Sequence, residues 1–421
     1  MIGEYIKSGS HISKAINLLL LASLASIYLQ KNGVQTFGIL LSLVCLCGYL
    51  SQLTAGSKFF QSRDHTRGIA IFIIFPLLSI ATIFLDPASS LSDFDSPSRS
   101  LLALFIFLWG SRFGLSRHHY AFGLYLGTLL AATVAIYETT TKDVYGVDLY
   151  FGSQSFGSMA LAMGIFSLFN KNSNSKILSS IYLRTFIFFC GITASILSQS
   201  RAGWIVIPII LVLWYFYELR TLSANSKRKV FIGIGLVALT ITLSFGETIA
   251  SRLLPIKNEV LCSFSDTDKC NLGSAGIRLE LYSGGWSAIS QSPLGHGYDT
   301  RVVIQDLITS NKIRDVGEFN NFHNEWIQLT VIHGATGAIA SLIFFSLIMK
   351  FAVTFINDKS SGHRYDSGFT LIAWIACLSV FGITQINLDR ASTASFFYFS
   401  LAILLSFGFS SRLSCNRIEK S

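Results

Sequence analysis

The chain has 421 residues, of which 51% are hydrophobic and only 13% are charged, and its mean hydropathy is +0.54. Soluble domains carry about 25% charged residues, so this composition excludes a soluble globular protein of this size. The apolar residues form long runs, which indicates membrane spans rather than one large core. Spans in lipid must satisfy their own backbone hydrogen bonds, and the alternating pattern of an outer-membrane barrel is absent, so we expect an all-α polytopic membrane protein.

The net charge is +9, and the basic residues lie in short loops between apolar runs. That placement argues against a nucleic-acid partner. The first apolar run, from Ile12 to Leu29, has no small-residue cleavage site. We therefore interpret it as a first span rather than a cleavable signal peptide.

About twelve transmembrane helices are expected from the lengths of the apolar runs. In chain order they cover 13–29, 35–53, 67–85, 99–115, 119–137, 152–169, 177–197, 202–217, 229–246, 324–350, 368–387 and 393–410. The run over 152–169 is rich in Gly and Ser, which suits close helix packing and would also suit a broken helix.

The distribution of Lys and Arg predicts the orientation in the membrane. With the N-terminus in the cytoplasm, the cytoplasmic segments hold 19 basic residues and the short outer loops hold 5. Basic residues favour the cytoplasmic side, so an even number of spans and two cytoplasmic termini are expected. The chain then divides into spans one to nine (1–246), a periplasmic loop domain between spans nine and ten (247–322), and the last three spans with a cytoplasmic tail (323–421).

The loop domain is the only long hydrophilic segment, and its length indicates a function. An amphipathic helix is predicted from Ile277 to Ser290, on the membrane surface or against the spans, and the turn over 292–297 ends it. Its apolar positions are Leu279, Leu281, Trp286 and Ile289.

The cysteines and acidic residues indicate no metal site. Cys262 and Cys270 share the loop domain and could form a disulfide if the loop is periplasmic. No Cys or His spacing resembles a zinc site, and no aspartate-rich motif would hold Mg²⁺, although Asp266 and Asp268 lie close together. We therefore expect neither a metal nor another cofactor.

Charged residues at span ends are candidates for function because charge near lipid is costly. Arg201, in a tight turn after the seventh span, is either an interfacial anchor or a ligand for an anion such as phosphate. Arg278, at the start of the amphipathic helix, is either solvated or part of the same site. His323, where the loop re-enters the membrane, is either an interfacial histidine or a general base.

The last outer loop carries Asp389 and Arg390, which could form a local ion pair, orient His323 or bind a sugar hydroxyl. In the tenth span, Gly334 and Gly337 are interpreted as a site of close helix packing. Two arginines and a histidine on one membrane face suggest that cations neutralise a diphosphate leaving group while a neutral imidazole accepts a hydroxyl proton. Such chemistry fits a lipid-diphosphate donor.

Five short motifs make the sequence resemble the O-antigen ligase family, whose wider group includes O-antigen polymerases and some protein O-oligosaccharyltransferases. They are Ser-Arg-Ala-Gly at 200–203, Gly-Ile-Arg-Leu at 276–279, Pro-Leu-Gly-His-Gly at 293–297, His-Asn-Glu at 323–325 and Gly-x-x-Gly at 334–337. One departure is Ile205, where the first motif often continues to leucine.

The resemblance implies a GT-C-like glycosyltransferase of the bacterial inner membrane with a periplasmic active site. Its donor would be O-antigen on undecaprenyl diphosphate, and its acceptor would be a sugar hydroxyl of lipid A–core. Metal-independent transfer with inversion is implied. The family's essential arginines correspond to Arg201 and Arg278, and its histidine corresponds to His323. Residues with a supporting role would be Asn324, Glu325, Asp389 and Arg390.

Two other functions remain open at the level of sequence. An O-antigen polymerase would use the same donor with a lipid-linked repeat unit as its acceptor. A transporter or flippase would carry the same lipid without chemistry, but there is no inverted internal repeat, and the candidate residues gather at one membrane face rather than at its midplane.

Overall fold

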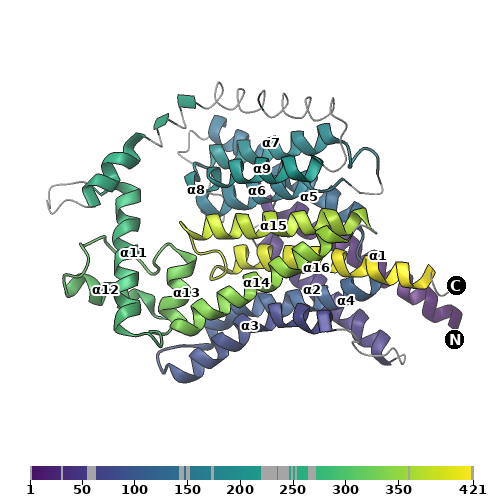
Figure 1. The fold of residues 1–421 in the computed structure, drawn as a ribbon, viewed down its shortest axis with the longest axis horizontal. Helices are drawn as coiled ribbons and strands as arrows, with labels where there is room; N and C mark the ends of the chain where they lie inside the picture. The colour runs from purple at the N-terminus through teal and green to yellow at the C-terminus, as the bar shows by residue number, and fades with distance from the viewer. Residues whose placement is uncertain are drawn as a thin grey trace.

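A computed structural model gives the fold of the chain. It describes residues 2–29, 32–54, 63–141, 147, 152–171, 175–219, 235, 246–247, 250–251, 254–263, 272–358 and 361–418. Within these residues the structure has fifteen labelled α-helices, two short 3-10 helices and a further helical stretch over 254–263, which confirms the all-α prediction (Figure 1).

The helices follow the predicted runs closely along the chain. The first group is α1 (Ile2–Ala25), η1 (Ser26–Tyr28), α2 (Gly33–Thr54), α3 (Arg63–Leu85), η2 (Leu91–Phe94), α4 (Asp95–Phe113), α5 (Arg117–Thr141), α6 (Ser153–Leu168) and α7 (Ile181–Leu197). The second group is α8 (Arg201–Trp204), α9 (Val206–Leu219), α11 (Gly273–Gln291), α12 (Thr300–Thr309), α13 (Glu325–His333), α14 (Ala335–Asn357), α15 (Gly362–Gly382) and α16 (Ala391–Ile418).

Among the described residues, seven helical segments are long and apolar enough to cross a membrane, so the chain is a multi-pass membrane protein. They are His11–Tyr28, Gly33–Leu53, Arg63–Leu85, Arg117–Thr141, Ala335–Asn357, Gly362–Gly382 and Ala391–Ser410. Four other predicted spans coincide with α4, α6, α7 and the α8–α9 pair, which are shorter or less apolar than these seven. The ninth predicted span, 229–246, lies outside the described residues apart from isolated positions. The count of twelve spans therefore stays a prediction.

Burial places α16 at the centre of the bundle and α3 at its edge. The central window of α16 is 94% buried within the protein, whereas that of α3 is only 33% buried. Small residues allow close approach of neighbouring helices: a Cβ on Gly164 of α6 would lie 3.2 Å from the Cα of Gly191 on α7. This pair supports the close-packing interpretation of the Gly- and Ser-rich span.

The loop domain lies at one end of the bundle, and the two chain termini lie at the other (Figure 1). In the figure α11 runs across the ends of the bundle helices, and it packs against α12 and α13. Its predicted helix is confirmed, but its predicted apolar face is only partly correct: Leu281 is fully buried, while Trp286 is 65% exposed. Small residues make up the rest of the buried face because α13 approaches closely there; a Cβ on Gly285 would lie 2.2 Å from Ile327. The helix α12 was not predicted.

The single span predicted over 324–350 is wrong in one respect, because the helix breaks at Gly334. This residue has φ of +65° and separates α13 from α14. It does not serve as a helix-packing glycine; its missing side chain faces the backbone of Pro293 and Leu294. A broken helix at this depth requires outside partners for its free backbone groups.

Candidate active site

The Pro-Leu-Gly-His-Gly segment supplies the partners for the helix break. The backbone N–H groups of His296 and Gly297 donate to the carbonyls of Val331 (2.8 Å) and Ile332 (3.2 Å), which end α13. The carbonyl of Pro293 accepts from the N–H of Ala335 (2.8 Å), which begins α14. Two of the five motifs, at 293–297 and 334–337, are therefore scaffold for α13 and its preceding loop.

Arg201 begins the four-residue helix α8, which packs against α6, α7 and α15. The preceding turn is tight: Gln199 has φ of +59°, and Ser198 and Ser200 are buried. Gly157 of α6 makes room for this turn, since a Cβ there would lie 2.0 Å from the Ser198 hydroxyl. Arg201 is thus held, half-buried, at the end of the bundle by the packing of three helices.

Arg278 is close enough to Arg201 for that charge to act on it. It lies on α11, and burial, followed by the positive charge of Arg201 among other neighbours, lowers its pKa. Within the part of the chain that the structure describes, neither guanidinium is within 4.0 Å of a carboxylate. Glu259 partly offsets the charge of Arg278 from beyond that distance. Two half-buried arginines that repel each other, neither of them in an ion pair with a described carboxylate, favour the binding of an anion between them.

His323 is close enough to Arg278 and Arg390 for both charges to act on its ring. Its backbone is left-handed, with φ of +51°, its N–H donates to Asn321 Oδ1 (3.0 Å), and its ring contacts Phe319 edge to face at 5.3 Å. Burial, followed by the charges of Arg278 and Arg390, lowers the pKa of the imidazole to about 4. The imidazole is therefore neutral at physiological pH, as a general base must be.

Asn324 holds the histidine in place by capping the next helix. Its side-chain oxygen accepts from the N–H groups of Trp326 (3.0 Å) and Ile327 (3.1 Å), so it is the N-cap of α13. Asparagine is among the best residues for this position. The middle residue of the His-Asn-Glu motif thus fixes where the helix begins, and thereby the position of His323 just before it.

Glu325 joins α13 to the last outer loop. The side chain is fully buried, and its Oε2 accepts from the backbone N–H groups of Asn387 and Leu388, the latter at 3.0 Å. Burial raises its pKa to about 7 despite these two hydrogen bonds. By holding the backbone of this loop, Glu325 determines where Asp389 and Arg390 lie relative to His323.

Asp389 and Arg390 do not form the short ion pair that was one interpretation of their sequence. Arg390 Nη1 lies 3.5 Å from Ser155 Oγ, and its charge acts on His323. For Asp389, burial, followed by the charge of Asp93, raises the pKa to about 6, while the charge of Arg390 acts in the opposite direction. Arg390 is therefore the member of this pair that lies beside the histidine.

Tyr282 is a residue of this site that the sequence did not single out. Its hydroxyl donates to the carbonyl of Ile383 and lies 3.5 Å from the carbonyl of His323. It lies one helical turn beyond Arg278 on α11, so the i, i+4 spacing was the available signal. Tyr282 links α11 to both other parts of the site.

Two predictions concern the loop domain more broadly. Cys262 is disulfide-bonded, but Cys270 lies outside the described residues, so their pairing stays a prediction. Asp266 and Asp268 also lie outside these residues. Among the described His, Cys, Asp and Glu side chains, no group of three or more is arranged to hold a metal ion.

Comparison with known proteins identifies the segment that contains this site. Residues 186–342 match the O-antigen ligase family. This segment is an O-antigen ligase family domain. It includes Arg201, Arg278 and His323 and extends past the helix break into α14.

The O-antigen ligase family match implies glycan ligase or polymerase activity. An uncharacterized protein of Haemophilus influenzae is similar over nearly the whole length, with 22% identity over 406 residues that cover 93% of this chain and 97% of that protein. This similarity extends well beyond residues 186–342. Because that relative is uncharacterized, it gives no information on activity.

Proposed function

We propose that this protein is an O-antigen ligase that transfers O-antigen from undecaprenyl diphosphate to a sugar hydroxyl of lipid A–core. The observation that carries the proposal is the convergence of Arg201, Arg278 and His323. These residues come from three separate segments, yet the charge of Arg201 acts on Arg278, and the charge of Arg278 acts on His323. A cationic pair beside a neutral base suits a reaction between an anionic leaving group and a hydroxyl.

The proposed reaction is a single displacement at the anomeric carbon of the donor sugar. The acceptor oxygen forms the new C–O bond while the C–O bond to the diphosphate breaks and the diphosphate leaves with the electron pair. The acceptor proton passes to the His323 imidazole. Arg201 and Arg278 stabilise the charge that grows on the leaving group, so the chemistry needs no metal, and attack from the opposite face inverts the anomeric configuration.

The low pKa of His323 fits this sequence of events. A base with a pKa of about 4 is neutral but weak. Because Arg278 and Arg390 contribute to that low value, a bound diphosphate would offset their charge and raise the histidine pKa toward the working pH. The base would then become stronger only when the donor is bound.

We further propose twelve spans in a GT-C-like arrangement, with both termini in the cytoplasm and the site on the periplasmic face of the inner membrane. Figure 1 supports the even number of spans, because the two termini lie together at the end opposite α11. The excess of basic residues in the predicted cytoplasmic segments supports the orientation.

The experiment is the substitution His323→Ala, with the products analysed as lipopolysaccharide and as lipid-linked glycan on gels. We expect folded, inserted protein, bare lipid A–core and accumulated lipid-linked polymer. Polymer on the core at the normal level would contradict the role of His323.

The same gels separate the two alternative functions. Deletion of a polymerase would leave core that carries one repeat unit, and deletion of a flippase would leave single units on the cytoplasmic side. Either pattern in the deletion strain would contradict the ligase proposal. Activity in excess chelator is expected as well; activity lost there and restored by Mg²⁺ would contradict metal-independent transfer.

A further inference from the structure

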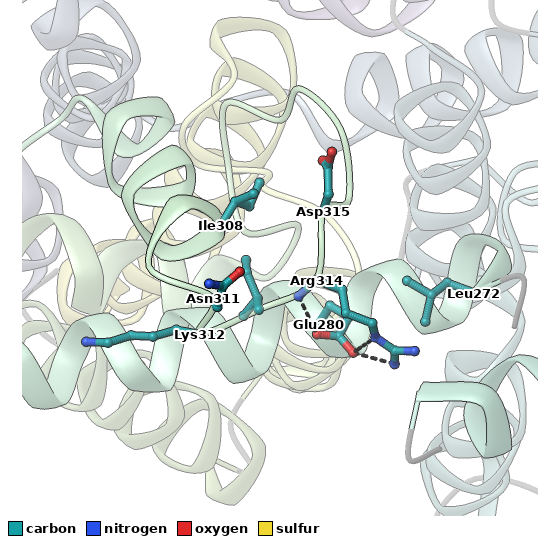
Figure 2. A pocket seen from close by; sticks show the side chains of 8 residues that line it. Leu272, Glu280, Ile308, Asn311, Lys312, Arg314 and Asp315 are labelled. Carbon is teal, nitrogen blue, oxygen red and sulfur yellow. Dashed lines mark hydrogen bonds and ion pairs between the residues drawn. The ribbon is translucent and has the colours of Figure 1, made fainter. Parts of the chain in front are cut away.

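A cavity of about 560 Å³ lies beside α11, apart from the candidate active site (Figure 2). Its polar lining comes from Glu280 on α11 and from Asn311, Lys312, Arg314 and Asp315 in the segment that follows α12, with one leucine and two isoleucines as its apolar lining. We call it the α11–α12 cavity. Its volume is in the range of sites that bind small molecules, about 300–1,000 Å³.

Arg314 builds the wall of this cavity and is not available for an anion. Its guanidinium donates to Glu280 Oε1 (2.6 Å from Nη2 and 3.0 Å from Nε) and to the carbonyl of Ser263 (2.9 Å). The dashed lines in Figure 2 mark its bonds to Glu280. This fork ties α11, the helical residues 254–263 and the segment after α12 together, so the cavity is a built part of the loop domain.

Asn311 and Lys312 supply the available polar groups. Both are exposed, and neither side chain has a hydrogen-bond partner among the described residues. Asp315 is also exposed, and its Oδ1 accepts from the N–H of Gly317 (2.9 Å). The lining therefore combines donors, acceptors and apolar carbon, with as many acidic as basic side chains.

This chemistry matches a neutral sugar better than a polyanion. Sugar hydroxyls both donate and accept hydrogen bonds, as the amide, ammonium and carboxylate of the lining require. The C–H surfaces of a sugar ring can pack on the leucine and isoleucines. A phosphate would find only Lys312 as an unpaired cation among the described lining residues, with Asp315 close by.

The position of the cavity relates it to the proposed reaction. Glu280 follows Arg278 by two residues, which places the two side chains about 200° apart around α11 and about 3 Å apart along its axis. The cavity and the active site thus lie on opposite sides of one helix. An α-helix with its side chains is about 10 Å in diameter. If a glycan extends from the active site across α11, the sugars beyond the reacting one would therefore reach the cavity.

We propose that the α11–α12 cavity is a glycan-binding subsite. It holds neutral, hydroxyl-rich sugars of a substrate that lie a few sugar units away from the bond being formed. The proposal rests on the function proposed above. Both the donor polymer and the core acceptor carry such sugars, so the test includes each of them.

The test is direct binding to the purified full-length protein in detergent, with two probes measured separately by calorimetry: delipidated O-antigen polymer and delipidated core oligosaccharide. The variant is Asn311→Gly with Lys312→Ala. Asn311 has φ of +53°, which glycine adopts without strain. The matched control is Lys257→Ala, an exposed lysine of the same domain that does not line the cavity.

We expect the double variant to weaken binding of one probe by about tenfold, as the loss of two hydrogen bonds predicts, while the control binds like the unchanged protein. The probe that responds identifies the bound glycan. Equal affinity of the double variant and the unchanged protein for both probes would overturn the subsite, as would failure of the unchanged protein to bind either.

Binding does not depend on turnover, so the two proposals fail separately. If His323→Ala transfers polymer normally, the proposed mechanism is wrong whatever the calorimetry gives. If His323→Ala is inactive but the double variant binds both glycans normally, only the subsite is wrong.

Discussion

At His323 the environment, more than the residue type, determines the chemistry. The sequence predicted a neutral imidazole held by Arg201 and Arg278. In the structure burial is the main cause, and the two charges that act on the ring are Arg278 and Arg390. Arg390 could not be assigned this place from sequence because the last outer loop reaches His323 only through tertiary contacts, among them the hydrogen bonds of Glu325.

The depressed pKa of His323 predicts how the residue reacts with diethyl pyrocarbonate, which modifies only the neutral imidazole. A group with a pKa of about 4 stays neutral as the pH falls from 7 to 5. Its modification rate should then change by less than about twofold, whereas an ordinary histidine of pKa 6.5 would slow by about 25-fold.

Mass spectrometry of the peptide that contains His323 measures this rate, and a solvent-exposed histidine added in a C-terminal tag provides the reference. A steep fall in modification of His323, parallel to that of the reference, would show that the ring is not held in its neutral form.

Lysine should not fully replace either arginine of the site, because a guanidinium is planar and donates two parallel hydrogen bonds, which an ammonium cannot do. We expect Arg278→Ala to lower kcat/KM by about 100-fold, because charge-assisted bonds to a diphosphate are strong and bidentate. Arg278→Lys should recover only part of this loss, since an ammonium offers a point charge. Full activity of the lysine variant would mean that simple charge neutralisation is enough. Steady-state transfer assays at a fixed acceptor concentration measure both variants.

At the scale of elements, the break between α13 and α14 is the feature that sequence could not predict. Gly334 lies within a long apolar run, and an apolar run with a glycine is ordinarily read as one span with a packing site. The partner that stabilises the break is the segment 293–297. It lies about forty residues earlier in the sequence but contacts the break in the folded structure. Asn324, by contrast, follows the local rule for N-cap residues once the start of α13 is known.

Substitution of Gly334 tests how tightly this break is built. Gly334→Ala should lower the free energy of unfolding by more than the backbone cost alone, about 1–3 kcal/mol, because φ of +65° with ψ of −155° is a conformation that is almost exclusive to glycine. The added Cβ would lie 2.3 Å from the carbonyl carbon of Leu294 and 2.4 Å from the Pro293 oxygen.

Gly317→Ala is the matched control, because Gly317 also has positive φ (+87°) but a Cβ there meets nothing within 4 Å. Thermal unfolding in detergent measures both variants, and we expect the lower midpoint for Gly334→Ala. Equal midpoints would show that segment 293–297 can move away from the added Cβ without loss of stability.

At the scale of the whole molecule, the buried or half-buried arginines near the two ends of α7 differ in whether they have an acidic partner. Near the start of α7, Arg184 pairs with Glu218 at 2.9 Å, and both side chains are only 2% exposed. Lys171 also contacts Glu218, at 3.3 Å. These charges are paired with each other, whereas Arg201 and Arg278 at the other end of α7 have no carboxylate within 4.0 Å among the described residues. Sequence predicted the second group as candidates but not the first, since buried pairing depends on which helices meet.

This asymmetry leads to a prediction about the membrane. If Arg201 and Arg278 serve a periplasmic reaction, the end that carries α11 and α12 must face the periplasm. In a variant whose native free cysteines are replaced by serine, single cysteines placed at two exposed lysines, Lys312→Cys after α12 and Lys176→Cys before α7, report the two ends. The predicted topology places the second of these positions in the cytoplasm. In cells with a permeabilised outer membrane, a membrane-impermeant maleimide should label the cysteine at position 312 at once and the cysteine at position 176 only after lysis. Labelling in the opposite order would show that the orientation is inverted. The site would then have no access to periplasmic lipid A–core, and the ligase proposal would fail.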